Sequence, residues 1–560
     1  METLEGAMAM HPSLIDPVPE ETARVARAAF RKGTLLMRVR DEIGVLYEDA
    51  MFADLYHARG QWAIAPWRLA LVTLFQFLEN LSDRQAAEAV RSRIDWKYAL
   101  GLELTDPGFD FSVLCEFRAR LLAGGQDQCL LEILLERLGA HGLIKSRGKQ
   151  RTDSTHVLAA IRTLNRLEFV GETLRAALHA LAQAAPAWLV QHGRSDWAER
   201  YGARVEQYRL PKSLAARQAL AEAIGTDGHD LLAALLNERE GFWPDRPLAV
   251  ERLRLVWIQQ FYHDGDSVRW REPADQPPVS GRLHSPYDPE ARYAKKRNIG
   301  WIGYKVHLTE TCDADRPHLI TDVQTTAAGL ADVAMTATVH SALASRGLLP
   351  AIHAVDSGYV NADLLVASRV SYALELLGPA LPDSSRQAQA GQGFDLSAFT
   401  IDWSERIARC PAGQISQSWK EERDERGVAV VRIGFSQKSC NSCPSRVLCS
   451  PFKPGCRANP RRLTILEQPA HEALQARRRE QNGELWKTHY ACRAGIEGTL
   501  SQGIRSFGLR RCRYLGQAKT HLQHVCTAAA MNLVRVDAWL RGQPRARTRQ
   551  SQVVALLAAA

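Results

Sequence analysis

The chain has 560 residues, of which 46% are hydrophobic and 24% charged, and its net charge is +9. This composition is that of an ordinary folded protein, too apolar for wholesale disorder, and the length suggests three or four domains of about 150 residues each. The longest apolar runs fall well short of the roughly 18 residues that a membrane-spanning helix needs. Because the acidic N-terminal stretch also lacks the pattern of a signal peptide, we expect a cytoplasmic protein without a membrane anchor.

The positive charge is concentrated in one segment. Residues 481–550 hold twelve Lys or Arg and three Asp or Glu, so they account for the whole net charge. Such a segment is typical of proteins that bind a phosphate-rich partner. The alternative is a solvated basic helix and tail.

The first part of the chain has a helical pattern. After a loose start, residues 20–145 predict an all-helical domain for DNA binding or oligomerisation. Pro66 fits the first turn of a helix, and Ser82 or Asp83 can cap the next one.

Strand patterns follow, and they predict a mixed α/β domain over residues 146–378. The alternation around Asp153 is typical of the end of a strand, residues 162–265 return to helix, and residues 302–325 form a plausible hairpin. A short buried strand then ends at Asp356. The helical stretch 162–265 is therefore predicted to be an insertion in the α/β domain.

The last third of the chain divides into three parts. Residues 379–470 contain a loop and a small Cys-containing β piece, residues 471–540 are helical, and residues 541–560 are a basic tail.

Three acids stand out because of where they lie. Asp153 and Asp356 are expected at strand ends, and Glu497 lies in a helix within the basic segment. Each alone has an ordinary explanation, such as a turn, a cap or an ion pair with Arg493. Together, carboxylates from two strands and a helix can meet at one edge of a sheet and hold two Mg²⁺ ions. Two such metals can drive an in-line phosphoryl displacement, and beside a basic segment its substrate would be nucleic acid.

The cysteines give a second metal hypothesis. Eleven cysteines without an export signal indicate reduced thiols rather than a disulfide framework. Cys440, Cys443 and Cys449, with Cys410 thirty residues earlier, can form a four-thiolate zinc site that stabilises a small insertion. Cys456 is a rival ligand, and unmetallated thiols are the alternative.

The residues around Glu497 carry a resemblance to a known family. Tyr490, Arg493 and Glu497 have the spacing Tyr-x2-Arg-x3-Glu, which resembles the signature of DDE transposases from bacterial insertion sequences. The resemblance spans most of residues 30–540 and rests on the number and order of its motifs. Its other segments are Phe52–Tyr56, Gln76–Glu79, Thr152–His156, Ser285–Arg292, Gly303–Lys305, Ala354–Tyr359, Ser506–Tyr514 and Ala528–Leu533.

The resemblance implies a fold and an activity. It implies an α/β ribonuclease-H-like core with a helical insertion, an all-α N-terminal domain and a small Cys-rich, zinc-ribbon-like insertion. Asp153, Asp356 and Glu497 would be the catalytic triad and would bind two Mg²⁺ or Mn²⁺ ions per site. The enzyme would cut double-stranded DNA at the terminal inverted repeats of its element and join the freed 3′-hydroxyl to target DNA. It would act as a homodimer or higher oligomer, associated with the bacterial nucleoid.

The expected DNA-binding residues follow from the same motifs. Tyr490 and Arg493 fall on the helical face of Glu497 and would position a phosphate there. The family signature often continues with a lysine where this chain has Ile504, so Arg505 would take that role from about 100° around the helix. The Ile504 departure supports the alternative of a non-catalytic DNA-binding protein derived from a transposase. The remaining expected DNA-binding residues are Lys305, Arg510, Arg511 and Arg513.

Overall fold

The fold was analysed in a computed structural model of the chain. The structure describes residues 8–10, 15, 17–57, 59–238, 247–450, 459–545, 553 and 556. Cys456, part of the predicted loose start and most of the predicted basic tail lie outside the described residues. No helix within the described ranges is long and apolar enough to cross a membrane.

The N-terminal region is helical, as the sequence predicts. Helix α3 begins at Pro66, and the Ser82 side chain caps α4 by accepting a hydrogen bond from the Gln85 backbone N–H. The elements of this region are β1 (Met8–Ala9), α1 (Glu20–Ala29), α2 (Leu35–Glu42), η1 (Asp49–Leu55), β2 (Gln61–Trp62), α3 (Pro66–Leu78), α4 (Asp83–Ser92), α5 (Ile94–Leu100), α6 (Ser112–Ala123) and α7 (Cys129–Ala140).

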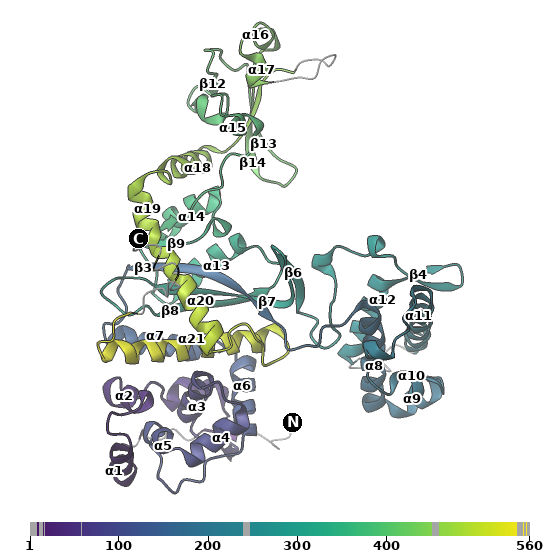
Figure 1. Ribbon diagram of the computed structural model, residues 1–560, viewed down its shortest axis with the longest axis vertical. Coiled ribbons are helices and arrows are strands. Elements are labelled where there is room, and N and C mark those ends of the chain that lie inside the picture. Colours follow the sequence, from purple (N-terminus) through teal and green to yellow (C-terminus); the bar gives the residue numbers. More distant parts are fainter. Residues whose placement is uncertain are drawn as a thin grey trace.

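A six-stranded sheet forms the centre of the molecule (Figure 1). Its strands are β3 (Lys149–Leu158), β6 (Arg292–Lys296), β7 (Ile299–Thr311), β8 (Ile320–Ala327), β9 (Ile352–Ala354) and β10 (Glu375–Leu377). The order is β10-β9-β3-β7-β6, and β8 also pairs with β7. Strands β9 and β10 run parallel to β3, whereas β7 is antiparallel to β3, β6 and β8. The predicted mixed α/β fold with a helical N-terminal region is confirmed.

One detail of the sheet matters for the site. Strand β3 pairs with β7 along its length, from Gln150 to Leu158, but its pairing with β9 ends at Arg151. Asp153 pairs with Leu308 in the middle of β3, so its predicted place at the end of a strand is wrong. Strand β3 continues past Asp153 to Leu158 because its hydrogen bonding with β7 extends that far.

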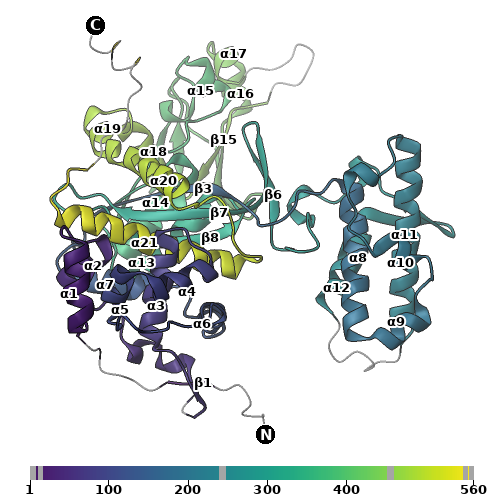
Figure 2. The same cartoon turned by 60° about the horizontal axis from the view of Figure 1, so that its bottom comes forward.

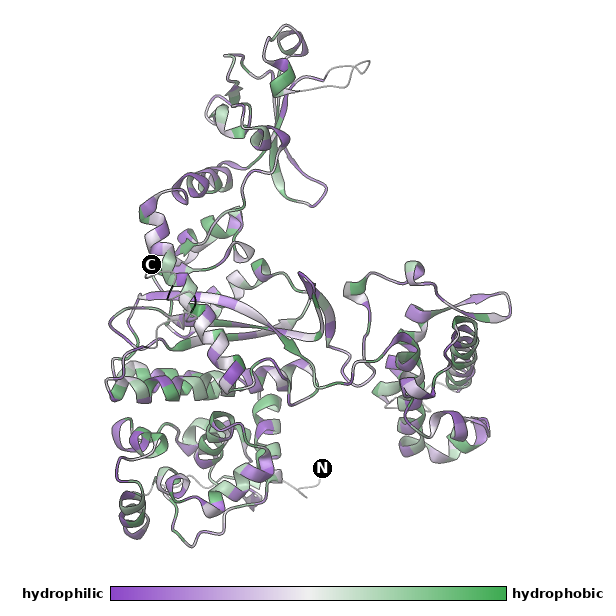
Figure 3. Ribbon diagram, in the orientation of Figure 1, coloured by the Kyte–Doolittle hydropathy of each residue, from purple (hydrophilic) through white to green (hydrophobic). Residues whose placement is uncertain are grey.

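Helix α21 joins the sheet to the N-terminal region. It packs against β8 on one side and against α3 and α7 on the other, and its residues from Leu522 to Leu533 are buried. Apolar residues follow much of its length in Figure 3. One hydrophobic core therefore runs through both parts. The helices beside the sheet are α13 (Met335–Ser345), α14 (Ala362–Tyr372), α18 (Gln468–Glu480), α19 (Glu484–Tyr490), α20 (Gly495–Ser506) and α21 (Gln517–Leu540), with the turns η5 (Asp332–Ala334), η6 (Ser357–Tyr359) and η8 (Ala491–Ala494).

Two further parts have cores of their own and extend away from the sheet (Figures 1 and 2). The first, over the predicted helical insertion, ends in a hairpin and contains α8 (Arg166–Ala184), α9 (Pro186–His192), α10 (Trp197–Tyr201), η2 (Gln207–Arg209), α11 (Leu214–Leu236), α12 (Leu248–Gln260), β4 (Phe261–Asp264) and β5 (Ser267–Trp270). The turns η3 (Pro273–Asp275) and η4 (Val279–Gly281) lead back to the sheet. The second contains α15 (Arg386–Ala390), η7 (Leu396–Ala398), β11 (Thr400–Asp402), β12 (Ile407–Arg409), β13 (Ser418–Arg423), β14 (Ala429–Gly434), α16 (Gln437–Asn441), α17 (Arg446–Cys449) and β15 (Arg462–Leu466).

Candidate active site

The three singled-out acids come from separate elements and share one arginine beside the point where the β3–β9 pairing ends. Asp153 lies in β3 just beyond the end of the β3–β9 pairing. Asp356 follows β9 and caps η6, where its Oδ1 accepts a hydrogen bond from the Gly358 N–H at 2.8 Å. Glu497 lies in the first turn of α20.

A single guanidinium joins the three carboxylates. Arg493 Nη2 lies 2.6 Å from Asp153 Oδ2 and 3.9 Å from Asp356 Oδ2. Arg493 Nη1 lies 3.0 Å from Glu497 Oε1, which is the ion pair expected from their spacing. Arg493 therefore neutralises part of a carboxylate cluster that would otherwise repel itself.

The acids differ in their exposure to solvent. The side chain of Asp153 is 13% exposed, that of Asp356 34% and that of Glu497 67%. Burial raises the pKa of Asp153 to about 6, although Arg493 beside it acts in the opposite direction. Asp153 is thus the carboxylate whose charge water screens least.

A second polar cluster lies next to the triad. Lys305 Nζ donates to Asp332 Oδ1 at 2.8 Å, and Ser154 Oγ lies 3.3 Å from the same oxygen. His307 Nδ1 lies 2.6 Å from the Tyr359 hydroxyl. Burial lowers the pKa of His307 to about 4, so its ring is neutral at pH 7. No sequence motif singles out Asp332, His307 or Tyr359 as a site residue, although Lys305 and His307, two residues apart in β7, point to the same face of the sheet.

The expected DNA-binding residues are divided between surface and interior. Arg505 and Arg511 are exposed, and Arg510 Nε donates to Thr155 Oγ1 at 2.8 Å, two residues from the Asp153 position. Tyr490 ends α19, and its ring stacks on Trp486 with centroids 4.6 Å apart.

Arg513 instead connects the sheet region to the N-terminal helices. Its Nη1 donates to the Leu81 carbonyl at 2.7 Å, its Nη2 contacts Asn80, and its guanidinium lies over the Phe77 ring. The motif residues Tyr490, Arg493 and Glu497 do not share one continuous helix, because η8 separates α19 from α20.

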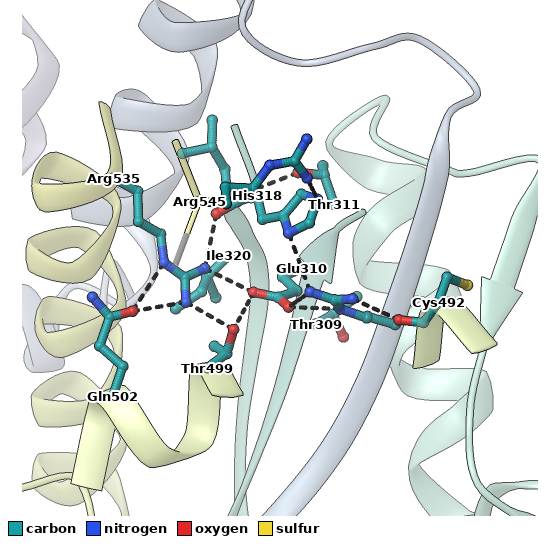
Figure 4. A network of polar contacts seen from close by, with 12 residues as sticks. Thr309, Glu310, Thr311, His318, Ile320, Cys492, Thr499, Gln502, Arg535 and Arg545 are labelled. Atoms are coloured by element: carbon teal, nitrogen blue, oxygen red, sulfur yellow. Dashed lines mark hydrogen bonds and ion pairs between the residues drawn. The ribbon is translucent and has the colours of Figure 1, made fainter. Parts of the chain in front are cut away.

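A buried ionic network holds the segment that carries the triad glutamate (Figure 4). Glu310 of β7 is fully buried and accepts hydrogen bonds from Arg151 Nε and Arg535 Nη1, both at 2.7 Å, and from Thr499 Oγ1 of α20 at 2.6 Å. Arg151 also donates to the carbonyl of Cys492 in η8 at 2.5 Å. The Glu310 network therefore joins β3, β7, η8 and α20. It fixes the backbone positions of Asp153 in β3 and Glu497 in α20 relative to each other.

The four predicted zinc ligands also come together. Cys410, Cys440, Cys443 and Cys449 line a cavity of about 30 Å³, which is room for one water-sized species. Burial raises the pKa of Cys449, and the other three thiols lie close enough to contribute in the same direction.

Neither cluster is arranged as a finished metal site. In the part of the chain that the structure describes, no group of three or more His, Cys, Asp or Glu side chains is placed to hold a metal ion. At the triad, the guanidinium of Arg493 is the positive group that the three carboxylates share. Three carboxylates around one positive group are the hard oxygen donors that Mg²⁺ and Mn²⁺ prefer, so the residues present fit such ions.

Two family models match parts of the chain. A family described as "Transposase DDE domain" matches residues 409–536, which include Arg493 and Glu497. A second, "Transposase domain (DUF772)", matches residues 25–120 in the N-terminal helices. No curated protein matches the chain. Two separate stretches of the chain are thus similar to transposase domains. Together they support a DDE transposase of an insertion sequence, as the resemblance predicts, and this family has a ribonuclease-H-like core, acts on DNA and generally uses a divalent metal.

Proposed function

We propose that the chain cuts DNA at the ends of an insertion sequence and transfers the freed strand to target DNA. The observation that carries this proposal is the convergence of Asp153, Asp356 and Glu497 on the guanidinium of Arg493. Three elements distant in sequence supply these acids. An ordinary ion pair joins one acid to one base, so it would not bring a second and a third carboxylate to the same arginine.

The three carboxylates would hold two Mg²⁺ or Mn²⁺ ions. When bound, such ions activate the attacking oxygen and stabilise the leaving oxygen of a phosphodiester. The protein orients the carboxylates through β3, η6 and α20, and the burial of Asp153 strengthens its attraction for a cation.

Arg493 has two roles in this proposal. In the DNA-free chain it neutralises the three acids. With DNA bound, its planar fork can turn to a phosphate, which it matches in a bidentate manner. Tyr490, Arg505, Arg510 and Arg511 would contact the DNA backbone, which positions the strand without specifying its sequence.

The other parts of the proposal concern assembly and stability. A homodimer or larger oligomer would bring two element ends together. The four cysteines would hold a structural zinc ion, and their shared small cavity supports this assignment.

A non-catalytic DNA-binding protein is the second candidate. Ile504, at the place of the family lysine, favours it. A chain of this kind would shift the mobility of element-end DNA and leave it uncut in the presence of Mg²⁺ or Mn²⁺.

The test is strand cleavage of DNA that carries the inverted repeats flanking the coding region. Asp153→Asn, Asp356→Asn and Glu497→Gln should each slow cleavage about 100-fold or more, because each removes a charge that binds the metals. Glu484→Gln, on the exposed start of α19, is the matched control and should cleave at the parent rate. If all three variants cleave normally, the mechanism is wrong.

A further inference from the structure

A cavity of about 380 Å³ lies against β3 directly after Asp153. Its walls include Ser154 and His156 of β3, Lys305 of β7 and the loop from Ala328 to Asp332. Its volume falls in the range of about 300–1,000 Å³ typical of ligand sites. Small residues keep the loop wall open, since a Cβ added at Gly329 would meet nothing within 4 Å.

The cavity has an excess of positive charge. Lys295 and Lys296 of the edge strand β6 line it, and both are exposed. Its one acid, Asp332, is paired with Lys305 at 2.8 Å, so the two β6 lysines remain as the net charge of the lining. Burial, with Arg510 and Lys296 nearby, lowers the pKa of His156, which leaves a neutral imidazole that can hydrogen bond.

The cavity adjoins both aspartates of the triad. Ser154 in its wall follows Asp153, and Lys296 is close enough to act on the charge of that acid. A Cβ built on Gly358 would lie 3.0 Å from Asp356 Oδ1 and 3.6 Å from Asp332 Oδ2, so one glycine separates the triad from the cavity wall. At a strand rise of about 3.3 Å per residue, His156 lies about 10 Å along β3 from Asp153, and the side chains of Ser154 and His156 leave the strand on the face opposite to that of Asp153.

We propose that this cavity is a phosphate subsite for the DNA strand that passes the triad. Lys295 and Lys296 would neutralise a phosphodiester one or two nucleotides from the bond that is cut. The ring of Trp301, whose centroid lies 5.3 Å from that of His156, supplies an apolar wall for the adjoining sugar. The inference rests on the proposed function, and it adds a substrate contact that lies outside the family signature around Glu497.

The experiment is phosphate interference on element-end DNA in binding assays without divalent metal. A neutral methylphosphonate replaces one phosphate at a time around the element boundary. For the parent chain, substitution one or two nucleotides from the boundary should weaken binding several-fold. Lys295→Ala/Lys296→Ala should bind unmodified DNA about tenfold more weakly and should lose the interference at that position. The slope of its log binding constant against log salt concentration should be smaller by up to about 2.

A control protein keeps the result decisive. Arg423→Ala/Arg426→Ala removes another exposed basic pair, in the Cys-containing part of the chain, and should keep the parent interference pattern. Because binding is measured without divalent metal and therefore without cleavage, a failure of catalysis is distinguished from a failure of the subsite. Thermal melting checks that the lysine variant is folded. The proposal is overturned if the folded lysine variant retains the parent interference at every position.

Discussion

Arg493 is the positive group that the three acids of the candidate site share. Its guanidinium contacts Asp153 at 2.6 Å and Glu497 at 3.0 Å and reaches Asp356 at 3.9 Å. A divalent ion that enters this centre must compete with a positive charge already paired with all three acids. Metal binding and DNA binding are therefore expected to favour one another, since a DNA phosphate offers the arginine another partner.

Removal of this charge should strengthen metal binding. Arg493→Ala is expected to bind Mn²⁺ about tenfold more tightly than the parent in the absence of DNA, which corresponds to about 1.4 kcal/mol. The same variant should bind DNA more weakly, because a phosphate contact is lost. Calorimetric titration with Mn²⁺ measures the first effect, and unchanged or weaker Mn²⁺ binding would show that the arginine does not compete.

The raised pKa of Asp153 predicts a pH dependence. An ordinary aspartate, with a pKa near 3.8, is ionised throughout the range from pH 5 to 7.5, whereas Asp153 titrates at about 6. Below pH 6 a proton occupies this carboxylate, so the Mn²⁺ affinity should fall as the pH is lowered from 7 to 5. Asp153→Asn should bind Mn²⁺ more weakly and lose this dependence. A parent affinity that is constant over the range would contradict the assignment.

At the scale of elements, the Glu310 network decides how α20 and η8 meet the sheet. Burial alone would raise the pKa of Glu310, but Arg535 and Arg151 lower it below its ordinary value near 4.5. A carboxyl group whose pKa is lower in the folded state stabilises the fold above its unfolded pKa, and this contribution is lost as the pH falls below that value.

Glu310→Gln should therefore destabilise the chain by about 3–5 kcal/mol at pH 7, because it leaves two arginines without their buried partner. The loss should be smaller at pH 4, where the parent has also lost part of this contribution. Chemical denaturation at both pH values measures the difference. Glu484→Gln, whose side chain is 88% exposed, is the control and should leave stability unchanged.

Local sequence patterns predict the helices and strands well, but they predict the contacts between these elements poorly. Pro66 and Ser82 act within one helical turn, and the β7–β8 hairpin depends on neighbouring strands, so the sequence predicts all three. The triad acids are predicted from their expected places at strand ends and in a helix, together with the family motif around Glu497. Asp332 and Glu310 were missed because their partners are distant in sequence, and their spacing shows no periodicity that would reveal them.

At the scale of the whole molecule, the described part of the basic segment, residues 481–545, does not present all of its cations to the solvent. Arg535 is paired with buried Glu310, and Arg513 contacts Leu81 and Asn80 of the N-terminal region. Arg505 and Arg511 are exposed. A concentration of charge in the sequence is therefore divided between stabilising the fold and facing the solvent.

This division can be measured through the salt dependence of DNA binding. Arg505→Ala/Arg511→Ala should reduce the salt slope by up to about 2, since each exposed cation can release one counterion from a phosphate. Arg513→Ala should instead lower the melting temperature and leave the slope nearly unchanged. The opposite pattern would show that Arg513 contacts DNA.

The most direct test of the account is the metal preference of a cysteine variant of the triad. Asp356→Cys replaces a hard carboxylate oxygen with a soft thiolate, which binds Mg²⁺ poorly and Mn²⁺ or Cd²⁺ better. If the Asp356 carboxylate binds the metal used in cleavage, the variant will not cut element-end DNA in Mg²⁺ and will recover part of its activity in Mn²⁺ or Cd²⁺. Cleavage at the parent rate in Mg²⁺ would contradict the account.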